Sequence, residues 1–261
     1  MKDLSIILLD NSKRERFHTL DWLSNQTVPR DRYELIWVEC YDRELDVVKS
    51  KVDKLITMHQ TGLANKPPAV NAGLIAASGT IVTMCDADAV YPPEFVASVI
   101  DSFKEGRQVL MHYEERSYST YPDGATLEQI KAMVFKLWPN VGACLSILRR
   151  DAIGFGGVDE HDTYHGLICG PNELTWRMMN SGVPEFWHDL RIYHFAHPGS
   201  DGQAKDEVGP TQKHTLWHNQ TAVDGFRQGR LLPLVENPEI HRLRMEQRII
   251  GTDLERSLAW G

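Results

Sequence analysis

The first hundred residues alternate short apolar runs with helical patterns, and this alternation restricts the chain to few folds. Each apolar run has the length of a buried strand. The runs are Ser5–Leu9, Leu35–Val38, Leu55–His59 and Ile81–Cys85. The helical patterns that follow them are Glu15–Ser24, Leu45–Lys54, Ala69–Ala77 and Glu94–Phe103. Such alternation predicts an α/β fold whose parallel sheet is covered by helices on both faces.

The second half of the chain is less regular. We expect strands at Val109–Tyr113, Leu145–Leu148 and Ile192–Phe195, and helices at Leu127–Leu137 and Leu174–Met179. Residues 199–213 are rich in Gly, Asp, Lys and Gln, which favours a loop where a lid over a bound donor is expected. The tail from Glu239 predicts an amphipathic helix that packs on the domain or on a second subunit of a homo-oligomer. Its apolar face comprises Ile240, Leu243, Ile250, Leu254 and Leu258.

Composition excludes several classes of protein. The formal net charge of −8 argues against a nucleic-acid binder, which would show a basic face. No apolar run approaches the length of a transmembrane helix, and the N-terminus lacks the pattern of a signal peptide. The cysteines form no C-x-x-C pair, so we expect free thiols in a reduced cytoplasm and no structural zinc. They are Cys40, Cys85, Cys144 and Cys169.

Asp86 and Asp88 directly follow the fourth apolar run. In open α/β sheets, ligands bind beyond the carboxyl ends of strands, and these two acids occupy such an end. Alternation along an extended backbone places both carboxylates on one side, where they repel each other unless a cation lies between them. A divalent ion with oxygen ligands, Mg²⁺ or Mn²⁺, satisfies this requirement. The simpler alternative is that the Asp-x-Asp pair caps the following turn.

The stretch NAGLIAASGTIVTMCDADAVYPPEF, residues 71–95, resembles the core of the GT-A glycosyltransferases, specifically the family-2-like group. It contains an Asn-x-Gly-Leu helix, a glycine, a strand, an Asp-x-Asp motif and a proline shortly after. Residues 5–39 resemble the opening strand, leucine-spaced helix and acid-terminated second strand of the same family. The resemblance covers about residues 4–197. It implies a Rossmann-like GT-A fold with a mixed, mainly parallel sheet flanked by helices, here followed by a C-terminal helical extension.

The resemblance also implies a nucleotide-sugar donor. Glu39 would bond the nucleotide base, usually uracil, unless it is an exposed loop acid. Lys66 and Asn71 would contact the diphosphate beside a helix N-terminus, which suits phosphate, unless Lys66 is a solvated lysine. Asp86 would contact the ribose, and Asp88 would ligate the metal. The implied donor-binding residues are Leu9, Asn11, Glu39, Lys66, Asn71, Asp86, Ala87 and Asp88.

The sequence offers several candidates for the catalytic base. Many inverting members carry a Glu-Asp pair just before a Glu-Leu-x-x-Arg helix, which residues 172–182 resemble, but Gly170 and Pro171 stand at the matching positions. Glu173 is one candidate, although its place also suits a carboxylate stabilised by the helix dipole. A retaining mechanism without such a base, or a non-catalytic relative, are the alternatives. The other candidate bases are Asp159, Glu160 and Asp162.

His194 and His197 follow a late strand. Imidazole is a good ligand for Mn²⁺, and the resemblance implies a histidine here that completes the metal site with Asp88. Both rings reach the site only if the backbone leaves the strand, and a buried structural histidine is the alternative. Candidates for stacking on an acceptor sugar, or else for core packing, are Trp138, Trp176 and Trp187.

Together these features predict a metal-dependent transferase that moves a sugar from a nucleotide-sugar, expected to be UDP-linked, to a carbohydrate or other hydroxyl acceptor. We expect inversion if a base is present. Residues 1–110 would form the donor-binding half, 111–215 the acceptor-binding half of the same domain, and 216–261 the helical extension. The alternatives are a non-catalytic nucleotide-sugar-binding protein and a sugar-phosphate nucleotidyltransferase. The latter normally needs a glycine-rich loop after the first strand, which LLDNSKRER does not provide.

Overall fold

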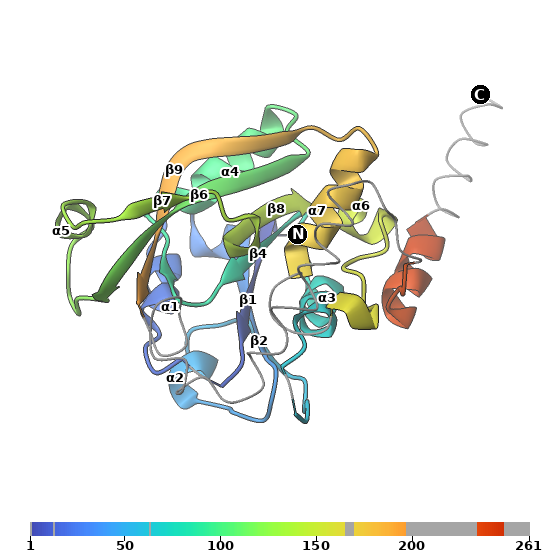
Figure 1. Ribbon diagram of the computed structural model, residues 1–261, viewed down its shortest axis with the longest axis horizontal. Helices are drawn as coiled ribbons and strands as arrows, with labels where there is room; N and C mark the ends of the chain where they lie inside the picture. The colour runs from blue at the N-terminus through green and yellow to red at the C-terminus, as the bar shows by residue number, and fades with distance from the viewer. Residues whose placement is uncertain (1, 13, 63, 165–169, 197–233, 248–261) are drawn as a thin grey trace.

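A mixed β-sheet runs through the centre of the structure and carries helices on both faces (Figure 1). The computed structural model describes residues 2–12, 14–62, 64–164, 170–196 and 234–247. Within these residues the sheet has nine strands in the order β3-β2-β1-β4-β8-β6-β9-β5, and β7 pairs with β6 outside this path. The predicted α/β fold is therefore confirmed.

The bounds of the elements place the chemistry-bearing residues. The strands are β1 (Leu4–Asp10), β2 (Tyr33–Glu39), β3 (Lys54–Thr57), β4 (Ile81–Asp86), β5 (Ala89–Val90), β6 (Val109–Thr120), β7 (Lys136–Trp138), β8 (Cys144–Leu148) and β9 (Glu185–Ala196). The helices are α1 (His18–Ser24), α2 (Asp46–Lys49), α3 (Lys66–Ala76), α4 (Phe95–Lys104), α5 (Leu127–Lys131), α6 (Arg149–Gly154) and α7 (Gly170–Asn180). Short 3₁₀ turns occur at Arg30–Arg32, Val141–Ala143 and Asp162–Tyr164.

The sheet changes character along the chain. Strands β1 to β4 pair in parallel with one another, as the alternation of strands and helices predicts. Beyond β4 the pairing turns antiparallel, because β8 runs against both β4 and β6. Strand β9 then runs parallel to β6 over most of its length. Antiparallel pairing therefore has a larger share of the described sheet than the sequence indicates.

Two apolar layers cover the sheet. Alternation along β1 sends Ile6 and Leu8 toward α1 and α4, and Ile7 and Leu9 toward α3, α6 and α7. Strand β2 is buried over its whole length, as expected for a strand covered on both faces. The packing of both layers fixes the carboxyl ends of β1, β2 and β4, from which the candidate site is built.

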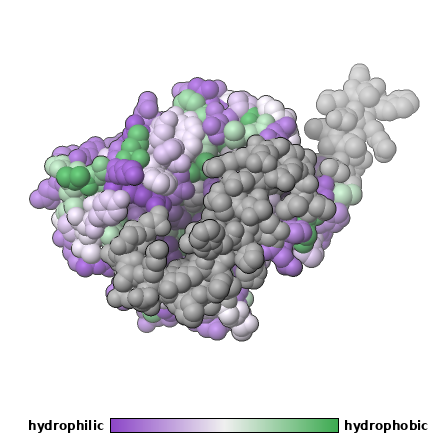
Figure 2. All heavy atoms as spheres, viewed as in Figure 1, coloured by the Kyte–Doolittle hydropathy of each residue, from purple (hydrophilic) through white to green (hydrophobic). Residues whose placement is uncertain are grey.

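The region around α5 differs from the sequence prediction. The expected helix over Leu127–Leu137 ends at Lys131, and Lys136–Trp138 forms strand β7 instead. This segment lies opposite Glu114–Arg116 of the long strand β6, whose exposed edge supplies backbone partners that override the helical pattern. Figure 2 shows apolar side chains over α5 and β7, where Val134, Leu137 and Trp138 are exposed.

The described part of the tail confirms one end of the predicted C-terminal helix. Residues 238–247 are helical, and Ile240 is fully buried in the layer that contains α3 and α7, with Leu243 packed beside it. The remaining apolar positions of that helix and the segment 199–213 lie outside the described residues. Of the residues the structure describes, none belongs to a helix long and apolar enough to cross a lipid bilayer.

Candidate active site

Three neighbouring parallel strands bring acidic residues together at their carboxyl ends, on one side of the sheet. In the strand registers, Asp10 lies opposite Glu39, and Leu9 lies opposite both Val38 and Asp86. Open α/β sheets bind ligands beyond these carboxyl ends of their strands. The sequence alone indicated Glu39 and Asp86 but gave no role to Asp10, although strand pairing places it between them.

Asp88 meets His194 at this edge. A turn after β4 leads into β5, whose Ala89 lies opposite His194 of β9. The Oδ1 atom of Asp88 is 3.5 Å from Nε2 of His194. Burial opposes protonation of His194, but attraction by Asp88 and Glu114 outweighs it and raises the pKa of the imidazole above its usual value. The structure thus brings together two of the three predicted metal ligands, while His197 lies outside the described residues.

Arg14 bridges two of the carboxylates. Its Nη2 lies 2.7 Å from Oδ2 of Asp88, and its Nη1 lies 3.3 Å from Oδ1 of Asp10. Arg43 reaches the other oxygen of Asp10 at 2.6 Å. Burial opposes the charge of Arg14, yet Asp88, Asp10 and Asp86 together raise the pKa of the guanidinium. Sequence reasoning missed this cation, because the basic run that contains it gives no sign of which arginine turns inward.

Glu39 is fully buried at the end of β2. Its Oε1 accepts hydrogen bonds from the hydroxyl of Ser12 at 2.5 Å and from the backbone N–H of Tyr41 at 3.0 Å. Its Oε2 is buried and has no hydrogen-bond partner among the described residues. Burial raises the pKa of the carboxyl. The group is therefore no exposed loop acid, and one of its oxygens can still accept a hydrogen bond.

Lys66 and Asp86 form a pair beside the start of a helix. Lys66 is the first residue of α3, and two prolines follow it in the first turn. Its Nζ lies 3.5 Å from Oδ1 of Asp86, and its side chain is largely buried. Leu9, Asn11 and Ala87 line the same strand ends and are buried. Lys66 is thus held at the site rather than solvated.

Asn71 is occupied by the protein itself. Its side-chain Nδ2 donates to the backbone O of Val158 at 2.8 Å, and its Oδ1 accepts from the backbone N–H of Val158 at 2.9 Å. Nδ2 also reaches the carboxylate of Glu160 at 2.9 Å. Gly157 makes this close approach possible, since a Cβ there would lie 2.6 Å from Oδ1 of Asn71. The geometry favours a role in anchoring the 157–160 loop over a diphosphate contact.

Glu173 is likewise committed to internal contacts. It is fully buried, forms an ion pair with Arg177, and its Oε2 accepts from the backbone N–H of Asp159 at 2.9 Å. Arg177 donates in turn to the backbone oxygens of Phe155 and Gly157. These contacts favour a structural role for Glu173. Of the other candidate bases, Asp159 is buried, Glu160 is half-buried and bonded to Asn71, and Asp162 is exposed.

Glu114 is a further site residue that sequence reasoning missed. It lies fully buried in β6, where its Oε1 is 3.9 Å from Nδ1 of His194 and 3.0 Å from Nε of Arg116. Its Oε2 accepts from the side chain of Asn140 at 2.9 Å. Burial raises the pKa of this carboxyl. The Glu114 carboxylate therefore lies near one nitrogen of the imidazole, whose other nitrogen faces Asp88.

The donor set suits a divalent ion only in part. Asp88 offers a carboxylate oxygen and His194 an imidazole nitrogen, a combination that Mn²⁺ accepts. Among the described residues, no three His, Cys, Asp or Glu side chains are grouped so that they could hold a metal ion by themselves. Asp88 and His194 would therefore need further oxygen ligands, such as those of a bound phosphate, to hold a divalent ion.

The three candidate tryptophans have different surroundings. Trp138 of β7 is 41% exposed, and Arg116 and Lys136 both approach its ring face. Trp187 is partly buried and packs against Tyr113, with ring centroids 4.8 Å apart. Trp176 is partly buried in α7. Trp138 is therefore the most accessible of the three for stacking.

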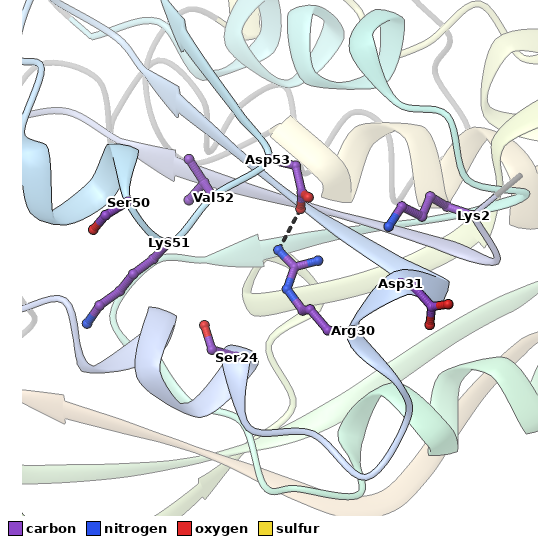
Figure 3. Close-up of a pocket in the computed structure, with 8 residues that line it drawn as sticks. All are labelled: Lys2, Ser24, Arg30, Asp31, Ser50, Lys51, Val52 and Asp53. Atoms are coloured by element: carbon purple, nitrogen blue, oxygen red, sulfur yellow. Dashed lines mark hydrogen bonds and ion pairs between the residues drawn. The ribbon is translucent and has the colours of Figure 1, made fainter.

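A pocket of about 580 Å³ lies at the amino ends of the strands, opposite the candidate site (Figure 3). Its lining includes Lys2, Asp31 and Asp53, which directly precede or lie near the starts of β1, β2 and β3. Arg30 of this pocket pairs with Asp53 at 2.6 Å. Since ligands of open α/β sheets bind at the carboxyl ends, this pocket is separate from the candidate site.

Solved structures share this fold at low sequence identity. GalNAc-T7 with UDP, GalNAc and Mn²⁺ matches with a TM-score of 0.60 and 13% identity, over 95% of this chain and 54% of its own. Mannosyltransferase PcManGT from Pyrobaculum calidifontis, in complex with GDP-Man and Mn²⁺, matches with a TM-score of 0.51 and 14% identity, over 94% and 79%. S. aureus TarS 1-349 with UDP-GlcNAc matches with a TM-score of 0.56 and 12% identity, over 86% and 73%. The chain thus spans about half the length of the GalNAc-T7 chain.

Sequence comparison gives a family but no individual relative. No curated protein sequence matches the chain significantly. The sequence profile described as glycosyl transferase family 2 matches residues 18–155, which is more than half of the chain. The matched region contains α1, the acid at the end of β2, helix α3 and the Asp86-Ala87-Asp88 turn. This chain belongs to glycosyl transferase family 2.

Proposed function

We propose that this glycosyltransferase transfers a sugar from a UDP-linked donor to a hydroxyl acceptor and uses a divalent metal ion to do so. The convergence of Asp86, Asp88 and His194 at the carboxyl edge of the sheet carries this proposal. Carboxylate and imidazole ligands at this edge suit a metal-bound diphosphate. Mn²⁺ is present in the GalNAc-T7 and PcManGT structures, which supports the same choice of metal here.

Glu39 is the proposed reader of the nucleotide base. Its Oε2 is buried without a protein partner among the described residues, so it can accept a hydrogen bond from an N–H on the base edge. Uracil presents such a donor beside its carbonyl groups. UDP accompanies GalNAc-T7 and UDP-GlcNAc accompanies TarS, whereas PcManGT is in complex with GDP-Man. The GalNAc-T7 and TarS structures support a uridine nucleotide, and the PcManGT structure gives GDP as the nucleotide to test against it.

Lys66 is the proposed contact for the diphosphate. It starts α3 and lies 3.5 Å from Asp86, so its charge is available at the position where the donor phosphates would lie. The free backbone N–H groups of the first helical turn add to this electropositive end, although Pro67 and Pro68 remove two of them. Asp86 is assigned to the ribose, and Leu9, Asn11 and Ala87 to the walls of the nucleotide site.

Asp88 and His194 are the proposed metal ligands. A bound divalent ion would neutralise the charge that builds up on the departing nucleotide diphosphate. The negative charge of Glu114, 3.9 Å from Nδ1 of His194, would favour the ring orientation that turns Nε2 toward Asp88. Asp88 and His194 would therefore hold the ion near the leaving group. Asp88 lies in the turn after β4, and His194 and Glu114 lie in β9 and β6.

Asp162 is the proposed base of an inverting transfer. A general base must accept the proton of the acceptor hydroxyl, and Asp162 is exposed while Asp159 and Glu173 are buried. Trp138 is the proposed stacking surface for an acceptor sugar, since its ring is partly exposed on β7. The division into a donor-binding half at 1–110 and an acceptor-binding half at 111–215 is part of the same proposal.

A cytoplasmic location is also proposed. Cys85 and Cys144 lie with their sulfur atoms 3.9 Å apart as free thiols, an arrangement that suits a reducing compartment. Formation of a homo-oligomer through the C-terminal helix remains a prediction, because the part of the tail beyond residue 247 lies outside the described residues.

The experiment is a donor screen. Thermal midpoints are measured with UDP, GDP and dTDP, each with and without Mn²⁺, followed by hydrolysis of the corresponding nucleotide-sugars. We expect UDP with Mn²⁺ to raise the midpoint more than either alone, because a ligand that binds only the folded state stabilises it. Equal responses to the three nucleotides would refute the uridine assignment, and an absence of any metal effect would refute the metal assignment.

A further inference from the structure

Among the described residues, Arg14 brings its positive charge closer to Asp88, the candidate metal ligand, than His194 does. We propose that Arg14 is the resident cation of the Asp88 site, and that a divalent metal ion must displace it before Asp88 can act as a full ligand. The inference rests on the proposed metal role of Asp88. It makes Arg14 a residue that sets metal affinity from within the protein.

The geometry shows that Arg14 is built into the site. Its side chain is 15% exposed, and its two terminal nitrogens reach two different carboxylates, Asp88 at 2.7 Å and Asp10 at 3.3 Å. Nη1 also donates to Oδ1 of Asn11 at 3.0 Å. A guanidinium presents its donors in a fixed planar fork, so one position satisfies all three partners. The arrangement is therefore specific to an arginine at this point of the chain.

A metal ion and Arg14 compete for the same carboxylate. Oδ2 of Asp88 is occupied by Arg14, while Oδ1 lies 3.5 Å from His194. An ion bound between Asp88 and His194 would place a double positive charge within a few ångströms of the guanidinium. Like charges at that distance repel strongly in a partly buried site, so each cation weakens the binding of the other.

Displacement does not leave Arg14 without partners. Asp10 is almost completely buried and would still attract the guanidinium, and the side chain of Asn11 stays within reach. Stranding a buried charge would be strongly unfavourable, whereas a shift between neighbouring acceptors is not. The Asp10 carboxylate therefore makes the exchange between Arg14 and a metal ion reversible.

Two other arginines provide matched controls. Arg43 pairs at 2.6 Å with the same Asp10, whereas the arginine that pairs with Asp88 is Arg14. Arg16 lies two residues from Arg14 and pairs with the exposed Asp123 at 2.8 Å. Removing either charge changes the net charge by the same amount as removing Arg14. Of these three arginines, Arg14 is the one that pairs with the proposed ligand itself.

The test is a titration of the full chain with Mn²⁺ alone, in which free Mn²⁺ is followed by electron paramagnetic resonance. We expect Arg14→Gln to bind Mn²⁺ about tenfold more tightly than the wild type, since a hydrogen bond to a charged group no longer competes. Arg16→Gln and Arg43→Gln should stay within about threefold of the wild type. The gain should vanish in the double variant Arg14→Gln/Asp88→Asn. Circular dichroism verifies that each variant is folded.

Arg14→Lys provides a second variant that keeps the charge. A lysine cannot span Asp10 and Asp88 with a planar fork, so we expect a smaller gain of a few fold. If the wild type binds Mn²⁺ and neither Arg14 variant binds it more tightly, the inference is overturned while the metal proposal stands. If no variant binds Mn²⁺, with or without UDP, the metal proposal fails and the inference fails with it.

Discussion

The Oδ1 atom of Asp88 lies 3.5 Å from Nε2 of His194, although one residue follows the fourth strand and the other stands near the end of the ninth. The two-residue strand β5 produces this contact, because it pairs with β9 and sets Ala89 opposite His194. The pairing of β5 with β9 thus brings the chain that follows β4 next to the end of β9. The short distance between the two proposed metal ligands depends on this strand pairing.

Replacement of Asp88 tests the chemistry directly. We expect Asp88→Asn to lower Mn²⁺-dependent hydrolysis of the donor by about 10²–10³-fold, since the charge that neutralises the leaving diphosphate is no longer held in place. The measurement is the hydrolysis rate at saturating donor. Asp101→Asn is the control, because Asp101 is an exposed acid of α4 that pairs with Lys104 at 2.7 Å. A rate for Asp88→Asn equal to that of the control would show that Asp88 is no metal ligand.

Glu39 is expected to determine nucleotide preference. Glu39→Gln keeps the shape of the side chain but removes the charge, so the hydrogen bond that the base N–H donates to this side chain should weaken and the Kd of UDP should rise about tenfold. Calorimetric titration with UDP and GDP measures both affinity and preference. Glu44→Gln serves as the control, because Glu44 is a half-exposed acid nearby that pairs with Lys49 at 2.6 Å. Unchanged UDP affinity in Glu39→Gln would place base recognition elsewhere.

Much of this fold could be predicted from the sequence, because the signals involved are local. Buried parallel strands appear as continuous apolar runs, and Ile81–Asp86 is observed within one residue of its predicted bounds. The acids that end β2 and β4 could be identified for the same reason. Helix α5 and strand β7 were harder, since the outcome there depends on an unpaired edge of β6 that the local pattern does not reveal.

The interior of the site could not be predicted, because it depends on contacts between distant segments. Nothing near Arg14 indicates that it reaches Asp88, and nothing near Glu114 indicates that it faces His194. Asn71 carries the opposite lesson. Its motif pointed to phosphate, yet the structure engages its amide with Val158, a partner that only the folded chain supplies.

Glu173 and Asp162 should separate a structural acid from a catalytic one. Glu173→Gln breaks a buried pair with Arg177, so the free energy of unfolding should fall by about 3 kcal/mol. Asp162→Asn alters an exposed residue and should change stability by less than about 0.5 kcal/mol. If Asp162 is the base, its variant should lose about 10²–10⁴-fold in transfer rate.

Urea unfolding and acceptor kinetics on the same two variants provide the answer. The assignment is reversed if Glu173→Gln is as stable as the wild type and loses transfer, while Asp162→Asn transfers normally. Hydrolysis of the donor by water serves as the internal control, because it does not depend on removing a proton from an acceptor hydroxyl.

Gly73 should be required for the approach of α3 to β1. A Cβ at Gly73 would collide with Cγ2 of the buried Ile7, so Gly73→Ala should destabilise the fold by about 1–3 kcal/mol despite the better helix propensity of alanine. Gly154 is the matched control, since it ends α6 and a Cβ there meets no atom within 4 Å. Gly154→Ala should leave stability unchanged or raise it slightly. Equal midpoints of urea unfolding for the two variants would contradict the close packing of α3.

His112 should make the fold sensitive to acid. The ring is fully buried in β6, where its Nε2 lies 3.0 Å from the hydroxyl of Ser98 and its ring packs against His188. Burial, reinforced by the neighbouring imidazole of His188, lowers the pKa of His112 to about 3. In the unfolded chain a histidine titrates near its ordinary value of about 6.5. Between these two values the unfolded chain binds a proton that the folded chain does not.

This contribution of His112 to stability is therefore complete above about pH 6.5 and declines as the pH falls toward 3. Integrated from about pH 7 to about pH 5, the loss amounts to about 2 kcal/mol. His112→Gln keeps a hydrogen-bonding side chain but removes the titration, so its unfolding free energy should fall less over this interval. Urea unfolding at both pH values measures the difference, with the exposed His59→Gln as control. The same acid dependence in His112→Gln and the wild type would mean that His112 is not the group that resists protonation.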